Sequence, residues 1–140
     1  MKYISTMVLM VFSLQVFAGG FSTPADAKKF TDKTVELFYQ MKFKEGLNAA
    51  KAYWPLPEVE IDSLGNQINQ QWPLVQQRFG QPTGIEFIRS EKIANSFVRY
   101  YYLHKFQNHA IYWRFDFYKP NNQWKINSIV FLDDLNMLYE

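Results

Sequence analysis

The spacing of apolar residues along this chain changes near Gly84. Before that point apolar residues recur every three or four positions, as in helices that bury one face. After it they alternate with polar residues, as in strands of an antiparallel sheet. The alternating part predicts four strands, over residues 85–93, 97–106, 110–119 and 124–132, and a short helix or tail over residues 133–140. The pattern therefore predicts an α+β fold in which three N-terminal helices pack on a curved four-stranded antiparallel sheet.

Start and stop signals sharpen the three predicted helices. Thr23 is placed as the N-cap of the first helix, with Pro24 at its first position and Asp26 near the positive end of its dipole. The second helix, over residues 43–54, ends before two prolines, and the third contains Pro73, which predicts a kink or two short helices. The predicted inward residues are Ala27, Phe30, Thr34, Leu37, Phe38 and Met41, then Leu47, Ala50 and Trp54, then Ile61, Leu64, Ile68, Trp72, Val75 and Phe79.

Two-residue turns give a testable pairing map for the strands. A turn at 107–108 places the aromatic residues of two strands on one face, with Val98 opposite Phe117, Tyr100 opposite Phe115, Tyr102 opposite Trp113 and His104 opposite Ile111. A turn at 121–122 adds Ile126, Ser128, Val130 and Leu132 to that face, beside Phe117, Phe115, Trp113 and Ile111. We interpret this face as the wall of a core or pocket, formed by Tyr100, Tyr102, Trp113, Phe115 and Phe117.

The opposite face of the predicted sheet combines charge with apolar surface. Arg99 lies opposite Asp116, which predicts a cross-strand salt bridge. An exposed sheet face rich in large apolar side chains is typical of an association surface. We therefore expect a homodimer or partner contact through Tyr101, Leu103, Tyr112, Arg114, Ile129 and Phe131.

The beginning of the chain is typical of a secretory signal peptide. Lys2 precedes an apolar run over residues 7–14 that is too short to span a bilayer, and Val16 and Ala18 occupy the −3 and −1 positions of a cleavage site. We predict a cleavable signal peptide over residues 1–18 and a single domain over residues 19–140, in the periplasm or secreted. An uncleaved N-terminal anchor is the alternative.

Composition excludes several classes of function. The chain has no cysteine, so it is not a lipoprotein and has no disulfide or thiolate chemistry. Without residues 1–18 it carries 14 basic and 13 acidic residues, in no basic block, which argues against nucleic acid as a partner. Only His104 and His109 could begin a metal site, and the six glycines are dispersed. We expect no metal and no cofactor.

General acid/base chemistry has one candidate location. A two-residue turn at 94–95 would place Arg89 beside Tyr100 and Glu91 beside Val98, both on the otherwise apolar face. A carboxylate, an arginine and a tyrosine hydroxyl together form the kind of pocket that an isomerase needs. The alternative is a bulge, or a position at the rim of the sheet, that turns Arg89 and Glu91 outward.

Three stretches of the chain resemble one superfamily. They are "KKFTDKTVELFYQM" in the first helix, "RFGQPTG" at the junction and the closing "FYKPNNQWKINSIVFLDD". With their order, they resemble small secreted bacterial members of the nuclear transport factor 2-like, or ketosteroid isomerase-like, superfamily. The resemblance implies a cone-shaped sheet around the helices, often an apolar pocket and often a dimer. None of the stretches is a catalytic motif, and enzyme members usually insert a hairpin before the last helix, so no catalytic residue is carried over.

The sequence favours an exported, non-enzymatic binding or protein-interaction module. One alternative is a pocket enzyme of isomerase or hydrolase type that acts on a small apolar substrate. The other is a periplasmic scaffold component of a secretion machine, because the scaffold domain of type IV secretion machines has a similar order of elements. A cavity of roughly 300 Å³ or more with converging polar groups would favour a small apolar ligand or catalysis, and a filled core would favour protein association.

Signal-peptide cleavage is directly measurable. Intact-mass analysis of the exported protein should give the mass of a chain that begins at Gly19, because the predicted cleavage follows Ala18. A mass that includes Met1 would contradict the prediction and support the uncleaved anchor.

Overall fold

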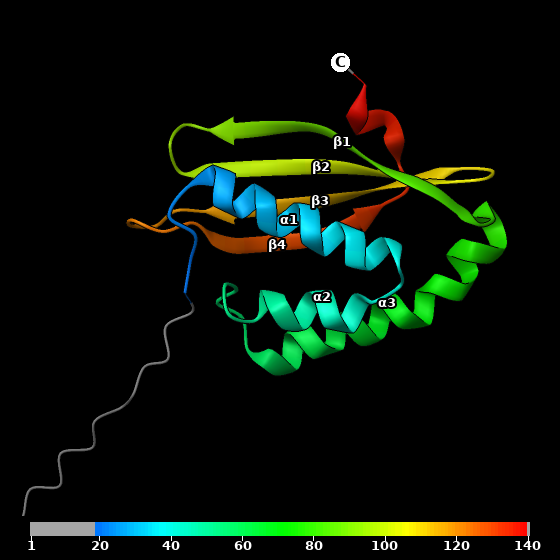
Figure 1. Ribbon diagram of the computed structural model, residues 1–140, viewed down its shortest axis with the longest axis horizontal. Coiled ribbons are helices and arrows are strands. Elements are labelled where there is room, and N and C mark those ends of the chain that lie inside the picture. The colour runs from blue at the N-terminus through cyan, green and yellow to red at the C-terminus, as the bar shows by residue number, and fades with distance from the viewer. Residues whose placement is uncertain (1–18, 140) are drawn as a thin grey trace, which may run out of the picture.

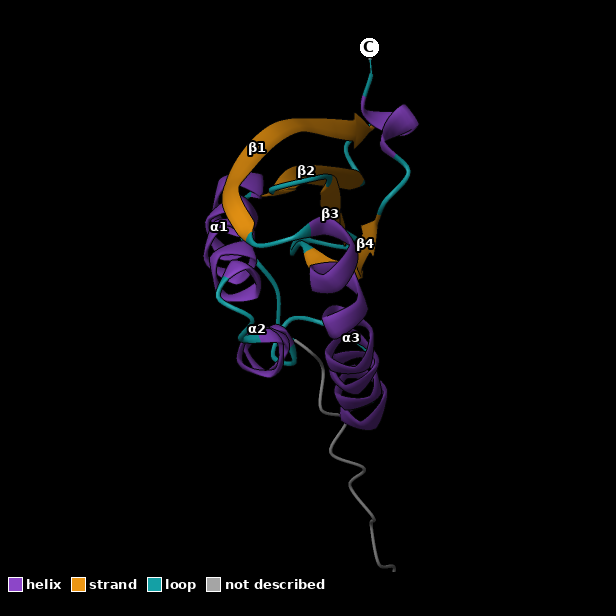
Figure 2. Cartoon of the chain, turned by 90° about the vertical axis from the view of Figure 1, so that its right-hand side faces the viewer, coloured by secondary structure: helices purple, strands orange, loops and turns teal. Residues whose placement is uncertain are grey.

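The computed structural model describes residues 19–139 and is an α+β fold with an open, four-stranded antiparallel sheet (Figure 1). Its elements are α1 (Pro24–Tyr39), α2 (Phe43–Ala50), α3 (Glu58–Phe79), β1 (Pro82–Ile93), β2 (Phe97–Phe106), β3 (Ala110–Tyr118), β4 (Lys125–Leu132) and the 3₁₀ helix η1 (Leu135–Leu138). The strands are neighbours in chain order, and the three α-helices lie against one face of the sheet (Figure 2). The predicted signal peptide lies outside the described residues. Among residues 19–139, no helix combines the length and the apolar character of a membrane span.

The first helix forms as its sequence predicts. The Thr23 hydroxyl accepts a 3.1 Å hydrogen bond from the Asp26 amide, and Pro24 occupies the first turn. The helix ends at Tyr39, so Met41 lies beyond it, half exposed and with a φ of 61°. Its buried stripe is therefore turned slightly from the predicted one and consists of Ala27, Thr31, Thr34, Val35 and Phe38.

One glycine allows the second helix to pack closely on the first, and another glycine ends the third helix. Gly46 lets α2 approach α1, since a Cβ there would lie 2.7 Å from the Phe38 ring. The helix ends at Ala50, four residues earlier than predicted. Pro73 lies within α3, which is assigned as one helix, and Gly80 ends that helix with a φ of 87°.

The sheet register confirms one hairpin and corrects two others. The β2–β3 pairing is as predicted, including Tyr102 opposite Trp113. Between β3 and β4 the prediction holds at Phe117 and Ile126, but a bulge at Asn127 shifts every later pair by one residue. Ser128, Val130 and Leu132 therefore pair with outer-face residues of β3, and Ile129 and Phe131 face the helices instead.

Rings fill the space between the helices and the sheet. Phe38 of α1 lies 4.5 Å from Trp113 of β3, and Trp72 of α3 lies 4.6 Å from Phe43 of α2, measured between ring centroids. Phe131 packs against both tryptophans at 5.2 and 6.0 Å. The predicted core wall is thus a close-packed aromatic core, which supplies most of the apolar burial that holds the fold together.

His104 lies inside this core, with its ring fully buried. Its Nδ1 accepts a 3.1 Å hydrogen bond from Trp113 Nε1, and its ring stacks on Phe106 at 4.6 Å. Because an indole nitrogen only donates, Nδ1 must be unprotonated, and the neutral ring carries its hydrogen on Nε2. Desolvation lowers the pKa of His104 to about 4.

This burial predicts acid destabilisation. The unfolded imidazole takes up its proton near pH 6.5, whereas the folded one does so only near pH 4. The contribution of neutral His104 is therefore fully present above pH 6.5 and is lost as the pH falls to about 4, by up to roughly 3 kcal/mol of unfolding free energy. Urea unfolding of His104→Gln at a series of pH values should show a smaller loss than wild type over this range. His109→Gln, which changes the exposed hairpin histidine, is the matched control and should keep the wild-type slope.

Candidate functional site

Arg89 and Glu91 of β1 lie on the face of the sheet away from the helices, which we call the outer face. The β1–β2 loop has three residues, with Ala94 at a φ of 47°, so Glu91 pairs with Arg99 instead of Val98. A bulge at Ile88 then restores the predicted register for the earlier part of β1. Arg89 and Glu91 are thus placed away from Tyr100 and Tyr102, so the predicted acid/base pairing was wrong and the bulge alternative is what the structure shows.

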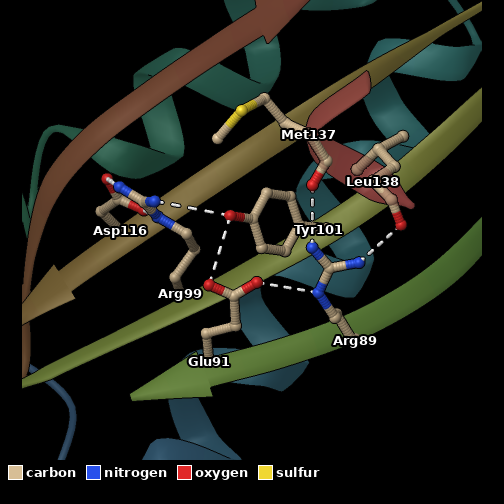
Figure 3. Close-up of polar contacts among 7 residues, drawn as sticks. All are labelled: Arg89, Glu91, Arg99, Tyr101, Asp116, Met137 and Leu138. Carbon is tan, nitrogen blue, oxygen red and sulfur yellow. Dashed lines mark hydrogen bonds and ion pairs between the residues drawn. The ribbon is translucent and has the colours of Figure 1, made fainter. Parts of the chain in front are cut away.

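Five residues of the outer face form a connected polar group, which we call the outer-face cluster: Arg89, Glu91, Arg99, Tyr101 and Asp116 (Figure 3). Arg99 forms a bidentate salt bridge with Asp116, in which Nε donates to Oδ1 at 2.7 Å and Nη2 donates to Oδ2 at 3.0 Å. This confirms the predicted salt bridge. Arg89 Nε donates to Glu91 Oε1 at 2.8 Å. The Asp116 carboxylate, hydrogen-bonded to Arg99, raises the pKa of that guanidinium.

Tyr101 joins the two ion pairs. Its hydroxyl lies 3.4 Å from Arg99 Nη1 and 3.5 Å from Glu91 Oε2. The Arg89 guanidinium stands over its ring, 4.8 Å from the centroid, within the range of a cation–π contact. The cluster is therefore one continuous network across β1, β2 and β3.

A hollow of about 230 Å³ opens beside the cluster, at the end of the sheet near the β1–β2 loop. Ile93 and Phe97 supply its apolar part, and Ile93 is 69% exposed. Arg99, Asp116 and Glu91 supply its polar part. We call this the outer-face hollow; its full lining is Glu91, Lys92, Ile93, Phe97, Val98, Arg99, Asp116 and Asn127.

The C-terminal segment, residues 133–139, crosses the outer face from β4 to β1, and we call it the C-terminal strap. Arg89 holds it by donating from Nη1 to the Leu138 carbonyl at 2.9 Å and from Nη2 to the Met137 carbonyl at 3.0 Å (Figure 3). Tyr101 and Tyr112, on this face, are only 3% and 2% exposed.

The predicted apolar interface is therefore not one open surface. Ile129 and Phe131 face the helices, because of the bulge in β4. Tyr101 and Tyr112 lie on the outer face but are buried, and Leu103 and Arg114 are half-buried there.

The two tyrosines predicted as catalytic candidates attach α1 to the sheet. The Tyr102 hydroxyl lies 2.5 Å from both Asp32 Oδ1 and Thr31 Oγ1, and Tyr100 donates to the Pro24 carbonyl at 2.8 Å. Burial raises the pKa of both phenols, so they stay neutral. Their position between helix and sheet gives them a structural role.

A second apolar surface lies between α3 and β4. Two hollows of about 210 and 380 Å³ adjoin there and share Gln71 and Phe131. Their lining is mainly apolar and includes Leu64, Ile68, Leu74, Val75, Ile129 and Leu132. A further open hollow of about 560 Å³ lies along α1 at Asp32, Lys33, Glu36 and Leu37. Neither region places an arginine–carboxylate network beside apolar surface as the outer face does.

The outer-face cluster is better suited to recognition than to acid/base catalysis. Glu91 is bonded to Arg89, and Asp116 to Arg99, with Arg114 Nε 3.6 Å from its second oxygen. Guanidinium groups thus occupy Glu91 Oε1 and both oxygens of Asp116, and the Tyr101 hydroxyl donates to Glu91 Oε2, so neither carboxylate is placed as a general base. Within residues 19–139 no three His, Asp or Glu side chains lie together as a metal site, and His104 and His109 serve the core and a hairpin loop.

Comparisons with known proteins add no family to this description. No protein-family model, no curated protein and no solved structure matches the chain.

Sequence reasoning found the Arg99–Asp116 pair but missed two parts of the site. The strap contact is made through backbone carbonyls, which leave no mark on the side-chain pattern. Phe97 could have been found, because the alternation that places Arg99 and Tyr101 outward also places Phe97 outward. Ile93 could not, because the predicted two-residue turn places it on the inner face with Glu91.

The Arg99–Asp116 pair should contribute measurably to stability. Asp116 is only 7% exposed, so Asp116→Asn leaves two guanidinium groups without their buried anion and should lower the free energy of unfolding by about 1–2 kcal/mol. Glu86→Gln is the matched control, since it removes an exposed ion pair with Lys105 worth well under 1 kcal/mol. Equal effects of the two substitutions in chemical unfolding would contradict this account of the cluster.

Proposed function

We propose that this protein is an exported, non-enzymatic interaction module that binds a polypeptide partner on its outer face. The observation that carries the proposal is the outer-face hollow. There, the exposed Ile93 and the half-buried Phe97 lie directly beside a fixed arginine–carboxylate pair. An apolar centre with an oriented arginine beside it is the composition typical of protein-binding sites.

The size and the chemistry of the hollow support a protein partner over a small substrate. Its volume of about 230 Å³ is below the range of roughly 300–1,000 Å³ that is usual for small-molecule sites. An apolar side chain of a partner fits such a space, with the backbone of the partner outside it. The pocket-enzyme alternative loses support, because Arg89 and Glu91 lie on the opposite face of the sheet from Tyr100 and Tyr102.

Two further parts of the proposal come from the sequence. The pattern of residues 1–18 supports export to the periplasm or beyond. Three helices on a curved antiparallel sheet are compatible with a nuclear transport factor 2-like cone, which the three quoted sequence stretches resemble. A secretion-machine scaffold would be one setting for such a module, with the same outer face as its contact surface.

Selection from a displayed library of random dodecapeptides tests the proposal. The wild-type chain should enrich peptides that share an apolar anchor residue. Ile93→Asp should weaken the binding of the selected peptides at least tenfold in fluorescence anisotropy, because it places a charge in the apolar part of the hollow.

Leu74→Asp is the matched control. Leu74 is 58% exposed on α3, so the same kind of change is made outside the outer face. Equal binding by wild type and Ile93→Asp, or loss of binding only in Leu74→Asp, would overturn the proposed surface. If repeated selection enriches no common motif, the proposed function itself is overturned.

A further inference from the structure

The C-terminal strap is held mainly by its backbone. The Arg89 fork donates to two successive carbonyls, those of Met137 and Leu138. Arg89 is itself oriented by Glu91 and lies over the Tyr101 ring. A guanidinium held in this way recognises adjacent peptide carbonyls without regard to the side chains that accompany them.

Most side chains of the strap are exposed, and only Leu135 and Leu138 are half-buried. Met137 and Tyr139 are 65% and 80% exposed, and no residue of η1 is buried. Tyr101 and Tyr112 on the face beneath, by contrast, are almost fully buried. The strap is thus attached at Arg89 by two contacts that another peptide backbone could make equally well.

The charges of this face select the kind of peptide. The ion pairs of this face join three guanidinium groups to two carboxylates, which leaves an excess of one positive charge among them: Arg89, Arg99 and Arg114 with Glu91 and Asp116. The strap brings Asp134 to this face, where its charge acts on Tyr112, whereas Asp133 lines the hollow between α3 and β4. An acidic start followed by apolar residues, as in the strap sequence "DDLNMLY", complements the excess positive charge.

The strap site and the outer-face hollow are continuous. Glu91 holds Arg89 with one carboxylate oxygen and also lines the hollow. A chain bound through its carbonyls at Arg89 is thus next to the hollow, which the strap contacts described above leave open.

We propose that the strap is a built-in competitor for the partner: an acidic and apolar peptide displaces it, takes its two carbonyl bonds to Arg89 and places an apolar side chain in the outer-face hollow. This inference rests on the proposed function and names its ligand class. In the resting chain the strap occupies the Arg89 fork and lowers the apparent affinity of the face for peptide.

A labelled copy of the strap provides the test. The probe is a synthetic peptide of residues 133–139 with an N-terminal fluorophore, titrated with the full chain. The full-length double variant Leu135→Ser, Leu138→Ser removes the two half-buried apolar side chains of η1 without adding charge, and detaches the strap. It should bind the probe at least tenfold more tightly than wild type, because the competitor in the same chain is removed.

Changes at Arg89 test the recognition itself. In the strap-detached background, Arg89→Gln should weaken probe binding at least tenfold, and Arg89→Lys should weaken it as well, because lysine keeps the charge but loses the fork. Arg78→Gln on α3 is the control for charge, and Trp fluorescence with far-UV circular dichroism confirms that each variant is folded.

Three results would overturn the inference: no probe binding to the strap-detached variant, equal binding by wild type and that variant, or equal binding by Arg89→Gln and its parent. Failure of the proposed function is a separate result. If library-selected peptides require Ile93 but are not displaced by the strap peptide, the outer face still binds a partner, and only the role of the strap is wrong.

Discussion

Two inserted residues at the edge strand β1 determine the chemistry of this protein. The three-residue loop at Ala94 turns Arg89 and Glu91 away from the helix-facing side, and the bulge at Ile88 returns Ile85 and Phe87 to that side. With a two-residue loop and no bulge, two charged groups would face the aromatic rings, at a cost of several kcal/mol each unless they were fully paired. With both insertions, the inner face stays apolar and the outer face gains Arg89, which holds the C-terminal strap, and Glu91, which lines the hollow.

The two faces then have different roles. The inner face is filled by rings that bind the helices, and its two tyrosine hydroxyls are used to fix α1. The outer face carries charges that are paired with one another and an apolar hollow that is open. A rigid core behind a polar and aromatic surface is an arrangement suited to recognition, because the surface is oriented before any partner arrives.

Most of the fold could be predicted from the sequence, because periodicity and turn residues determine it locally. The β2–β3 hairpin was right in every pair, since its two-residue turn leaves no freedom in the register. The errors in strand register all come from single inserted residues, at Ile88, Asn127 and the three-residue loop at Ala94, for which the alternation of side chains gives no signal. The site was predicted only in part for the same reason: Arg99 and Asp116 lie in the hairpin without a bulge, whereas Arg89 and Glu91 follow one.

Backbone amide NMR of the full chain, recorded while a library-selected peptide is added, tests the central claim most directly. The account predicts that the resonances of Arg89, Ile93, Tyr101 and Leu138 shift together at the same peptide concentration, as the partner binds and the strap leaves. Shifts confined to the groove between α3 and β4, at residues such as Ile68 and Leu74, would contradict it and move the binding surface to that edge of the sheet.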